Sequence, residues 1–394
     1  MTDETIVFFG GPIFDGQQML HDHGAVFNRE VCSAIVPEGD LDKCWAECSA
    51  EHCVDIDSRI NLHGNILSLG YADLQVNGGG GVMFNDEPSV QALQTIANAQ
   101  YSLGTRHFLP TLITATKDKT LAAIDAVADA MSAGVPGIAG LHLEGPHLSV
   151  EKKGAHSKEL IRPMQQDDVE ALLAAAKKIP LVKLTIAPEN VSIEQVQILL
   201  SEGIVLALGH TNASYETCLA YRAAGVQCIT HLFNAMSQFG SRDPGLVGAA
   251  LTTQAFTMGL IADGVHVHPG TIQAALTAMG GMGRVYLVSD AMAVAGTSLQ
   301  RFSLDERTIV RQNNRLTLAD GTLAGADLEL THAIRFLVNE VGVELSEALR
   351  SAVTIPRNML VGEARECSLL GSALSNCITI QSNLQSAHAA LTTP

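Results

Sequence analysis

Short apolar segments recur between residues 66 and 290, and longer amphipathic stretches separate them. The eight segments are rich in Leu, Ile and Val, as buried strands are, and comprise Ser68–Leu74, His107–Ile113, Ile138–Leu143, Leu181–Ile186, Ile204–Leu208, Val226–Thr230, Met258–Ala262 and Val285–Val288. The intervening stretches are rich in Ala and have helical periodicity, as in Val90–Ser102, Leu121–Met131, Val169–Lys177, Ile193–Leu200 and Tyr215–Ala224. Strands that alternate with helices predict parallel βα units, and eight such units predict a (β/α)8 barrel of the TIM type.

The first 65 residues have a different pattern, without crossover helices. Ile6–Phe9, Ala25–Phe27 and Ala34–Val36 are short strand candidates separated by Gly, Asp and His turns. The tail contains one more strand candidate, Cys377–Ile380. We therefore expect an α/β protein with two domains. Residues 66–361 would form the barrel, and residues 1–65 and 362–394 would form a small β-sandwich that both termini build together.

Composition and charge narrow the class of protein. The 394 residues are 47% apolar and 16% charged, which suits one large domain and a small one. The formal net charge is −17. Nucleic acids and anionic membranes need clustered Lys and Arg, so we expect neither as a partner. The start, Met1–Thr5, lacks the basic region of a signal peptide, and no run of about 18 apolar residues occurs, so we expect a cytoplasmic protein.

Eight cysteines are scattered along the chain, which in a reducing compartment predicts free thiols and no disulfide framework. Cys44, Cys48 and Cys53, with His52, form the one local cluster. Their spacing matches no Cys-x-x-Cys pair, so a surface loop is the favoured interpretation, with a structural zinc site as the alternative.

Three strand ends lead into side chains that bind metals, namely Glu144, His210 and His231. Taken singly, the glutamate would more often be a loop acid in a salt bridge, and each histidine a satisfied polar residue. The carboxyl ends of barrel strands meet at one face, however, so the three are expected to lie together. Two histidines and one glutamate form a catalytic zinc ligand set that leaves a fourth position for water.

Asp290 stands at the end of the last predicted strand, in Val288-Ser289-Asp290-Ala291. A hydrolase needs a group that takes a proton from water and gives one to the leaving group, and Asp290 is placed to do so. An aspartate after a strand is also a frequent N-cap of the next helix. Its position in the sequence leaves both interpretations open.

Six motifs occur in order between about residues 65 and 335. They are Gly70–Gly78 (GYADLQVNG), His142–Pro146 (HLEGP), Gly209–Thr211 (GHT), Thr230–Met236 (THLFNAM), Ala262–His266 (ADGVH) and Ser289–Ala291 (SDA). Together they resemble the amidohydrolase superfamily, and within it the family that deacetylates N-acetylglucosamine 6-phosphate. A single motif would be weak, but six in register are specific.

The resemblance implies roles for individual residues. Glu144, His210 and His231 would bind the catalytic metal, and Asp290 would be the general acid and base. His266 would lie near the acetyl carbonyl and stabilise the developing oxyanion. The remaining substrate contacts implied by the resemblance are Ala155, Asn234, Ala235, Leu323, Ala324 and Gly325. Arg242 would reach the phosphate of the substrate in a neighbouring subunit, which implies a homodimer.

Arg242 has a physical rationale and a plain alternative. A dianionic phosphate on an acidic protein needs a planar, permanently charged donor, and arginine supplies one. The residue stands in the predicted loop Gly240-Ser241-Arg242-Asp243-Pro244. Without the resemblance, the favoured interpretation would be a solvated loop charge paired with Asp243.

The first barrel strand bears on the number of metal ions. Many amidohydrolases carry His-x-His there, whereas this chain has Gln75-Val76-Asn77. Neutral amides are poor zinc ligands beside imidazole, so we expect one divalent ion per subunit, as zinc, and no bridged pair.

The reaction expected from the resemblance is hydrolysis of N-acetyl-D-glucosamine 6-phosphate to D-glucosamine 6-phosphate and acetate in amino sugar catabolism. The nearest alternative is the same chemistry on another N-acetylated sugar phosphate, such as the galactosamine epimer, or on a cyclic amide. A non-catalytic barrel that acts as a scaffold is the alternative of a different class. Such a barrel would have no reason to keep a metal-ligand set and an acid at its mouth.

Overall fold

The computed structural model describes residues 5–42, 56–253, 255–361 and 367–391. Cys44, Cys48 and Cys53, with His52, lie outside these residues, so the interpretation of that cluster stays a prediction.

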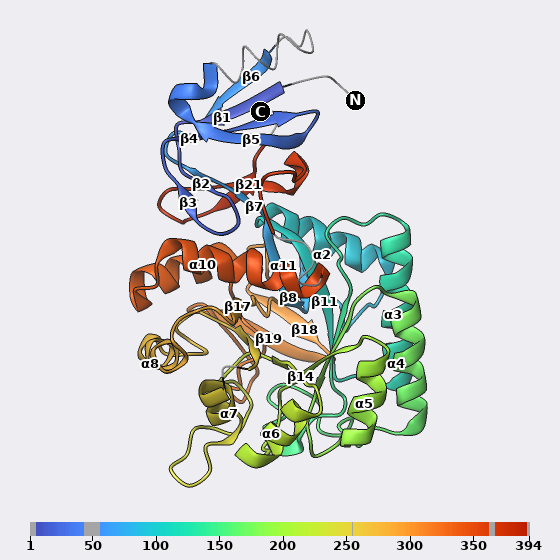
Figure 1. Ribbon diagram of the computed structural model, residues 1–394. Helices are drawn as coiled ribbons and strands as arrows, with labels where there is room; N and C mark the ends of the chain where they lie inside the picture. The colour runs from blue at the N-terminus through green and yellow to red at the C-terminus, as the bar shows by residue number, and fades with distance from the viewer. Residues whose placement is uncertain (1–4, 43–55, 254, 362–366, 392–394) are drawn as a thin grey trace.

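Eight parallel strands form the central sheet, and each neighbours the next in chain order (Figure 1). They are β8 (Tyr71–Val76), β11 (Thr105–Ile113), β12 (Leu141–Glu144), β13 (Val182–Ile186), β14 (Val205–Leu208), β15 (Cys228–Ile229), β16 (Thr257–Leu260) and β17 (Val285–Leu287). A parallel bridge between Val76 and Ala291 joins the first strand to the segment after the last one. The predicted (β/α)8 barrel is thus confirmed.

Helices connect these strands and cover the outside of the barrel (Figure 1). They are α2 (Val90–Ser102), α3 (Lys117–Ser132), α4 (Gln166–Lys178), α5 (Ile193–Ser201), α6 (Tyr215–Ala223), α7 (Gly245–Thr253), α8 (Pro269–Met279), α9 (Leu330–Phe336), α10 (Leu345–Ala352) and α11 (Thr354–Val361). Four of them begin where a Ser or Thr side chain accepts a backbone N–H of the first turn, at Ser89, Thr116, Ser192 and Ser214. These caps end the preceding loops and fix where each crossover helix starts.

Two further sheets are formed by the amino-terminal segment and, in the second of them, by the tail as well. The first has the order β5 (Val31–Pro37), β4 (His23–Asn28), β1 (Thr5–Phe9) and β6 (Ile56–Asn61). The second has the order β22 (Ala387–Ala389), β21 (Cys377–Ile380), β7 (Ile66–Leu69), β2 (Ile13–Phe14) and β3 (Met19–Leu20). The predicted tail strand pairs antiparallel with β7, with Cys377 opposite Leu69. The expected second β-rich part built from both termini is therefore present.

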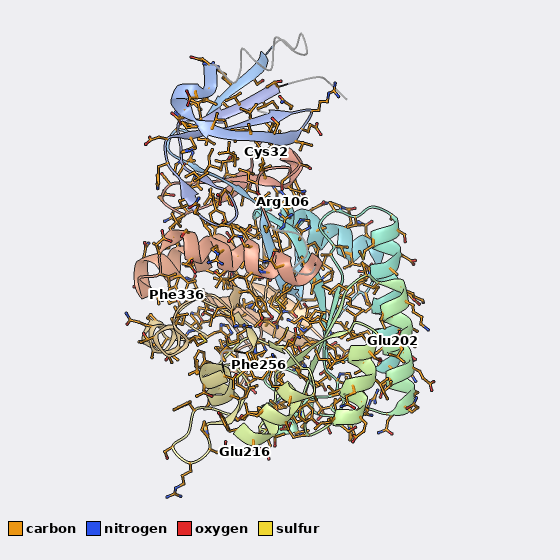
Figure 2. The ribbon with its side chains drawn as sticks, in the orientation of Figure 1. Cys32, Arg106, Glu202, Glu216, Phe256 and Phe336 are labelled. Carbon is orange, nitrogen blue, oxygen red and sulfur yellow. The ribbon has the colours of Figure 1, made fainter. Side chains whose placement is uncertain are left out.

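One predicted strand is divided by the structure. The run Ser68–Leu74 was expected to be a single barrel strand, but Ser68 and Leu69 belong to β7 and the barrel begins at Tyr71. Gly70 lies between the two strands. Only glycine fits at this position, because a Cβ there would lie 2.0 Å from Cγ of Arg106. Arg106 lies where the end sheets meet the barrel (Figure 2). A continuous apolar run hides such a junction, since both halves are fully buried.

A three-stranded antiparallel sheet that the sequence pattern did not predict follows the last barrel strand. It consists of β18 (Arg301–Leu304), β19 (Arg307–Gln312) and β20 (Arg315–Thr317). Its turns, Asp305-Glu306 and Asn313-Asn314, have positive φ at all four residues, as tight hairpins require. Its buried side chains, among them Leu304, Ile309 and Leu316, pack with residues at the carboxyl end of the barrel.

The remaining elements are short. A two-stranded hairpin joins β9 (Gly78–Gly79) to β10 (Val82–Met83), and single helical turns occur at η1 (Glu38–Asp40), η2 (Val150–Lys152), η3 (Leu337–Val341) and η4 (Leu374–Asn376). Within the described ranges, none of the helices combines the length and apolar character needed to cross a membrane.

Candidate active site

The strand ends bring the predicted metal ligands together at the carboxyl face of the barrel. Glu144 is the last residue of β12, and His210 and His231 each follow their strand by two residues. His210 Nε2 lies 3.1 Å from His231 Nε2 and 3.3 Å from Glu144 Oε1, and His231 Nε2 lies 3.1 Å from the same oxygen. All three side chains are buried.

This arrangement fits a bound cation. His210 Nδ1 donates to the carbonyl of Lys152 at 2.8 Å, so in the neutral ring the lone pair of Nε2 faces the other two ligands. A carboxylate oxygen and two imidazole nitrogens that converge in this way form a divalent-metal donor set. The backbone contact of His210 is the kind of second interaction that fixes the tautomer of a metal-binding histidine.

The backbone at the strand ends adopts an uncommon conformation. His210, His231 and Asp290 have φ of 46°, 28° and 48°, in the left-handed region that side chains other than glycine rarely adopt. Such conformations cluster at functional sites, where the surrounding structure holds them in place. Here they turn the chain sharply after β14, β15 and β17, at two of the three triad residues and at Asp290.

Asp290 lies beside this triad and is held by amides of the first strand. Asn77 Nδ2 donates to its Oδ1 at 2.7 Å, and Gln75 Nε2 donates to the same atom at 3.1 Å. Gln75 Nε2 also lies 3.3 Å from each carboxylate oxygen of Glu144. The amide groups of Gln75 and Asn77 thus act as hydrogen-bond donors that orient the carboxylates. The N-cap interpretation of Asp290 is wrong, because the next helix begins only at Leu330.

The surroundings of Glu144 and Asp290 shift the pKa values of the two carboxylates in opposite directions. Burial disfavours the charge on Glu144, but hydrogen bonds with His210 and His231 outweigh it and hold the pKa of Glu144 well below its usual range. Burial raises the pKa of Asp290, and the neighbouring charge of Glu144 raises it further. A ligand that stays charged beside an acid with a raised pKa is the arrangement that acid–base chemistry needs.

A cavity of about 370 Å³ opens over these residues. The predicted substrate contacts that line it are Ala155, Asn234, Ala235, His266, Leu323 and Gly325. Ala324 does not line it, because its side chain is fully buried in the apolar cluster below the three-stranded sheet. His266 faces the cavity with its Nδ1 tied to Asp263 Oδ2 at 2.6 Å.

Arg242 lies outside this cavity, in an exposed loop. Within the described residues, the alternative pairing of Arg242 with Asp243 is not observed. Oδ1 of that aspartate accepts the backbone N–H groups of Tyr215 and Gly245. Among the described residues, Arg242 has no hydrogen-bond or ion-pair partner. Its guanidinium is therefore available to a group outside this chain.

Sequence reasoning missed His156, which is buried and lines the same cavity. His156 Nδ1 lies 2.8 Å from Thr114 Oγ1 and also accepts the Thr114 backbone N–H at 3.3 Å, so Nε2 is the ring nitrogen on the side of the metal ligands. His156 Nε2 lies 3.9 Å from Glu144 Oε2, and burial lowers the pKa of this histidine to about 3. The available signal was its position directly after Gly154-Ala155, within a predicted substrate segment.

The fold and this site define a class of protein, and comparison with known proteins agrees. The model of the amidohydrolase family matches residues 66–356, and the chain belongs to that family of metal-dependent hydrolases. Among curated relatives, the chain is 38% identical to N-acetylgalactosamine-6-phosphate deacetylase of Shewanella sp. (strain ANA-3), over 88% of this chain and 86% of that protein. It is 33% identical to N-acetylglucosamine-6-phosphate deacetylase of Haemophilus influenzae, over 95% and 94%.

The solved structures agree in fold. The crystal structure of N-acetylglucosamine-6-phosphate deacetylase from Pasteurella multocida superimposes with a TM-score of 0.88 at 30% identity, covering 97% of each chain. Similarity over the whole length includes the end sheets as well as the barrel.

Proposed function

We propose that this protein hydrolyses N-acetyl-D-glucosamine 6-phosphate to D-glucosamine 6-phosphate and acetate, as a step of amino sugar catabolism. The observation that carries the proposal is the convergence of Glu144, His210 and His231 beside Asp290 in one cavity of an amidohydrolase barrel. Relatives that are named for this activity align with nearly the whole chain, which supports the choice of substrate.

Glu144, His210 and His231 would hold one zinc ion per subunit. Zinc bound there would supply Lewis acidity, which activates water and polarises an amide carbonyl. Gln75 and Asn77 support a single ion, because both amides are engaged as hydrogen-bond donors to carboxylates.

Asp290 would move the proton. Its carboxylate accepts a proton from water as the oxygen of that water bonds to the acetyl carbon. It then donates this proton to the amide nitrogen as the C–N bond breaks, so the free amine leaves, and the second proton of the water passes to solvent as the acid product becomes acetate. The hydrogen bonds from Asn77 and Gln75 keep the carboxylate pointed at the site throughout.

Two histidines would stabilise the negative charge that develops on the carbonyl oxygen. His156 would carry its hydrogen on Nε2, beside the triad, and would there be the donor that an oxyanion needs. His266 lines the same cavity, and its imidazole is oriented by Asp263, in keeping with the role predicted for it from the sequence motifs.

The sugar would contact Ala155, Asn234, Ala235 and the turn Leu323–Gly325, with Ala324 as the buried support of that turn.

The phosphate would be held by Arg242 of a second copy of the chain, so the active unit would be a homodimer. The guanidinium is exposed and has no partner in the part of the chain that the structure describes, which supports this assignment. We place the enzyme in the cytoplasm. We assign residues 66–361 to the barrel, and residues 1–65 and 362–394 to the small domain.

N-acetylgalactosamine 6-phosphate is the second candidate substrate. The relative from Shewanella is named for that epimer and is 38% identical, against 33% for the relative from Haemophilus influenzae. The two sugars differ only in the orientation of one hydroxyl group.

The deciding experiment measures acetate release on protein whose zinc content has been counted. The substrates are both sugar phosphates and unphosphorylated N-acetylglucosamine. Faster release from the glucosamine phosphate, with about one zinc per chain, is the expected result. Faster release from the galactosamine phosphate would move the assignment to the epimer. No release from either phosphate by zinc-loaded protein would overturn it.

Arg242 allows a separate test of the dimer. The variants R242A and D290N should each be nearly inactive, yet mixing and re-equilibrating the two should restore activity. In the mixed dimer, one site combines its own Asp290 with the partner's Arg242. If the two residues acted within one chain, mixing would restore nothing.

A further inference from the structure

A short segment connects the metal site to the cavity wall. This segment, the strap, comprises Lys152–His156 and lies between β12 and α4. The carbonyl of Lys152 accepts the Nδ1–H of His210 at 2.8 Å, and Gly154, at φ +55°, lies so close that an added Cβ would be 3.4 Å from Cε1 of that ring. The strap ends in His156, whose ring contacts the His210 ring with centroids 4.4 Å apart. Its position therefore affects a metal ligand and a polarising donor together.

Arg307 is bonded to the middle of this strap. Its Nη1 donates to the carbonyl of Ala155 at 2.8 Å. The two residues are far apart in sequence, since Arg307 is the first residue of β19 in the three-stranded sheet. A charged donor on a carbonyl makes a stronger hydrogen bond than a neutral donor does.

The sheet that carries Arg307 is itself anchored, so it can hold the strap in place. Leu304 and Ile309, on either side of the hairpin turn, are fully buried. At the turn, the carboxylate of Asp305 lies 3.3 Å from Lys119 Nζ, and its backbone N–H donates to Asp86 Oδ1 at 2.9 Å. The hairpin is thus attached to the barrel on both sides of the arginine.

The hydrogen-bonding capacity of the Arg307 guanidinium is only partly used. Its Nη2 is buried and, within the described part of the chain, has no hydrogen-bond partner. A buried donor without a partner costs stability, and such groups in native structures often have a functional explanation. The explanation that the contacts offer is the fixed position of the Ala155 carbonyl.

We propose that Arg307 is a positioning residue of the active site. Through Ala155 it holds the strap so that the Lys152 carbonyl orients His210 for the metal and His156 points Nε2 at the carbonyl oxygen. The part of the role that concerns His156 rests on the proposed deacetylation. The part that concerns His210 rests only on the donor set.

The test compares R307M, R307K and R315M with the wild-type protein. Methionine keeps much of the packing of the arginine stem but has no donor, whereas lysine keeps the charge and one donor toward Ala155. Arg315 is an exposed residue of the same sheet and serves as the matched control. For each protein, the zinc dissociation constant is measured by competition with a chromogenic chelator, together with the unfolding midpoint of the metal-free form. Where the wild type is active, kcat and KM for the sugar phosphate follow.

R307M should raise the zinc dissociation constant roughly tenfold and lower kcat by a similar factor, as losses of outer contacts at metal sites do. KM should change less than kcat. R307K should recover most of both losses, and R315M should match the wild type. Zinc affinity unchanged in R307M overturns the proposal, whatever the activity of the wild type. A loss that R307K does not restore, with a lower unfolding midpoint in both variants, shows a purely structural role and also overturns it. An inactive wild type with the predicted zinc series would count against the deacetylase assignment alone.

Discussion

Replacing Gly209 by alanine is expected to weaken metal binding, although this residue binds nothing itself. A Cβ at Gly209 would lie 2.9 Å from Thr185 Cγ2 and 2.9 Å from Thr230 Cβ, whereas carbon atoms in contact keep about 3.5–4.0 Å. Neither threonine is free to rotate away, because their hydroxyls are bonded to each other at 2.7 Å and Thr185 is bonded to His142 Nε2 at 2.8 Å. The backbone that leads into His210 must move instead.

The size of the effect follows from these contacts. Overpacking of a filled interior by one carbon costs about 1–3 kcal/mol in the free energy of unfolding. A displaced ligand costs roughly 10- to 100-fold in metal affinity, as comparable disturbances around metal sites do. The assay is the zinc dissociation constant by chelator competition, with a urea unfolding curve of the metal-free protein beside it.

Gly283 provides the matched control for this substitution. No atom lies within 4 Å of an added Cβ at Gly283, and its φ is not positive, so G283A should be neutral or slightly stabilising. G209A with the zinc affinity and stability of G283A would refute the reasoning. The barrel interior would then be softer than its hydrogen-bonded threonines indicate.

Three further predictions concern single side chains. D290N should keep zinc and fold but lose about 10²- to 10⁴-fold in kcat, measured as acetate release; wild-type rates would remove Asp290 from the mechanism. H156N should bind zinc normally and lose about 10²- to 10³-fold in kcat, and a change confined to KM would contradict its role at the carbonyl. Burial raises the pKa of Asp73 from 3.8 to about 7, so folding favours its protonated form. Its contribution to the stability of the metal-free protein is present below about pH 4 and is lost as the pH rises to 7, with an upper limit of about 4 kcal/mol. Urea midpoints should show this loss in the wild type but not in D73N, and equal pH dependence would reject it.

The barrel and the triad could be predicted from the sequence because both depend on local patterns. Apolar runs and helical periodicity are local, and parallel topology then brings strand ends to one face. Cys377–Ile380 was found for the same reason, as a compact β-branched run between turns. Glu144, His210 and His231 required no knowledge of distances, only of which strands they end.

The features that the sequence did not indicate depend on contacts between distant residues. His156 acquires its orientation from Thr114, and the sheet containing Arg307 acquires its place from burial against Met292 and Ile113. Neither relation has a period or a fixed spacing along the chain. Gly70 was equally hidden, since a buried strand continues in the pattern on both sides of it. The burial of Ala324 between two cavity-lining neighbours likewise reflects packing from the far side.

The end sheets lie at the face of the barrel opposite to the catalytic mouth. Gly70 N–H donates to the carbonyl of Asn376 at 2.7 Å, and Gly104, just before β11 begins, has room for Ala387 only because it lacks a Cβ. The contact with Ala387 places β22 against the amino ends of the barrel strands, and the sheet that contains β1 lies farther from the barrel, at the top of the view in Figure 1. A molecule tethered to a solid support or fused to a carrier through either of these strands would therefore point its cavity away from the attachment. Immobilisation by that route should leave diffusion of sugar phosphates into the site unobstructed.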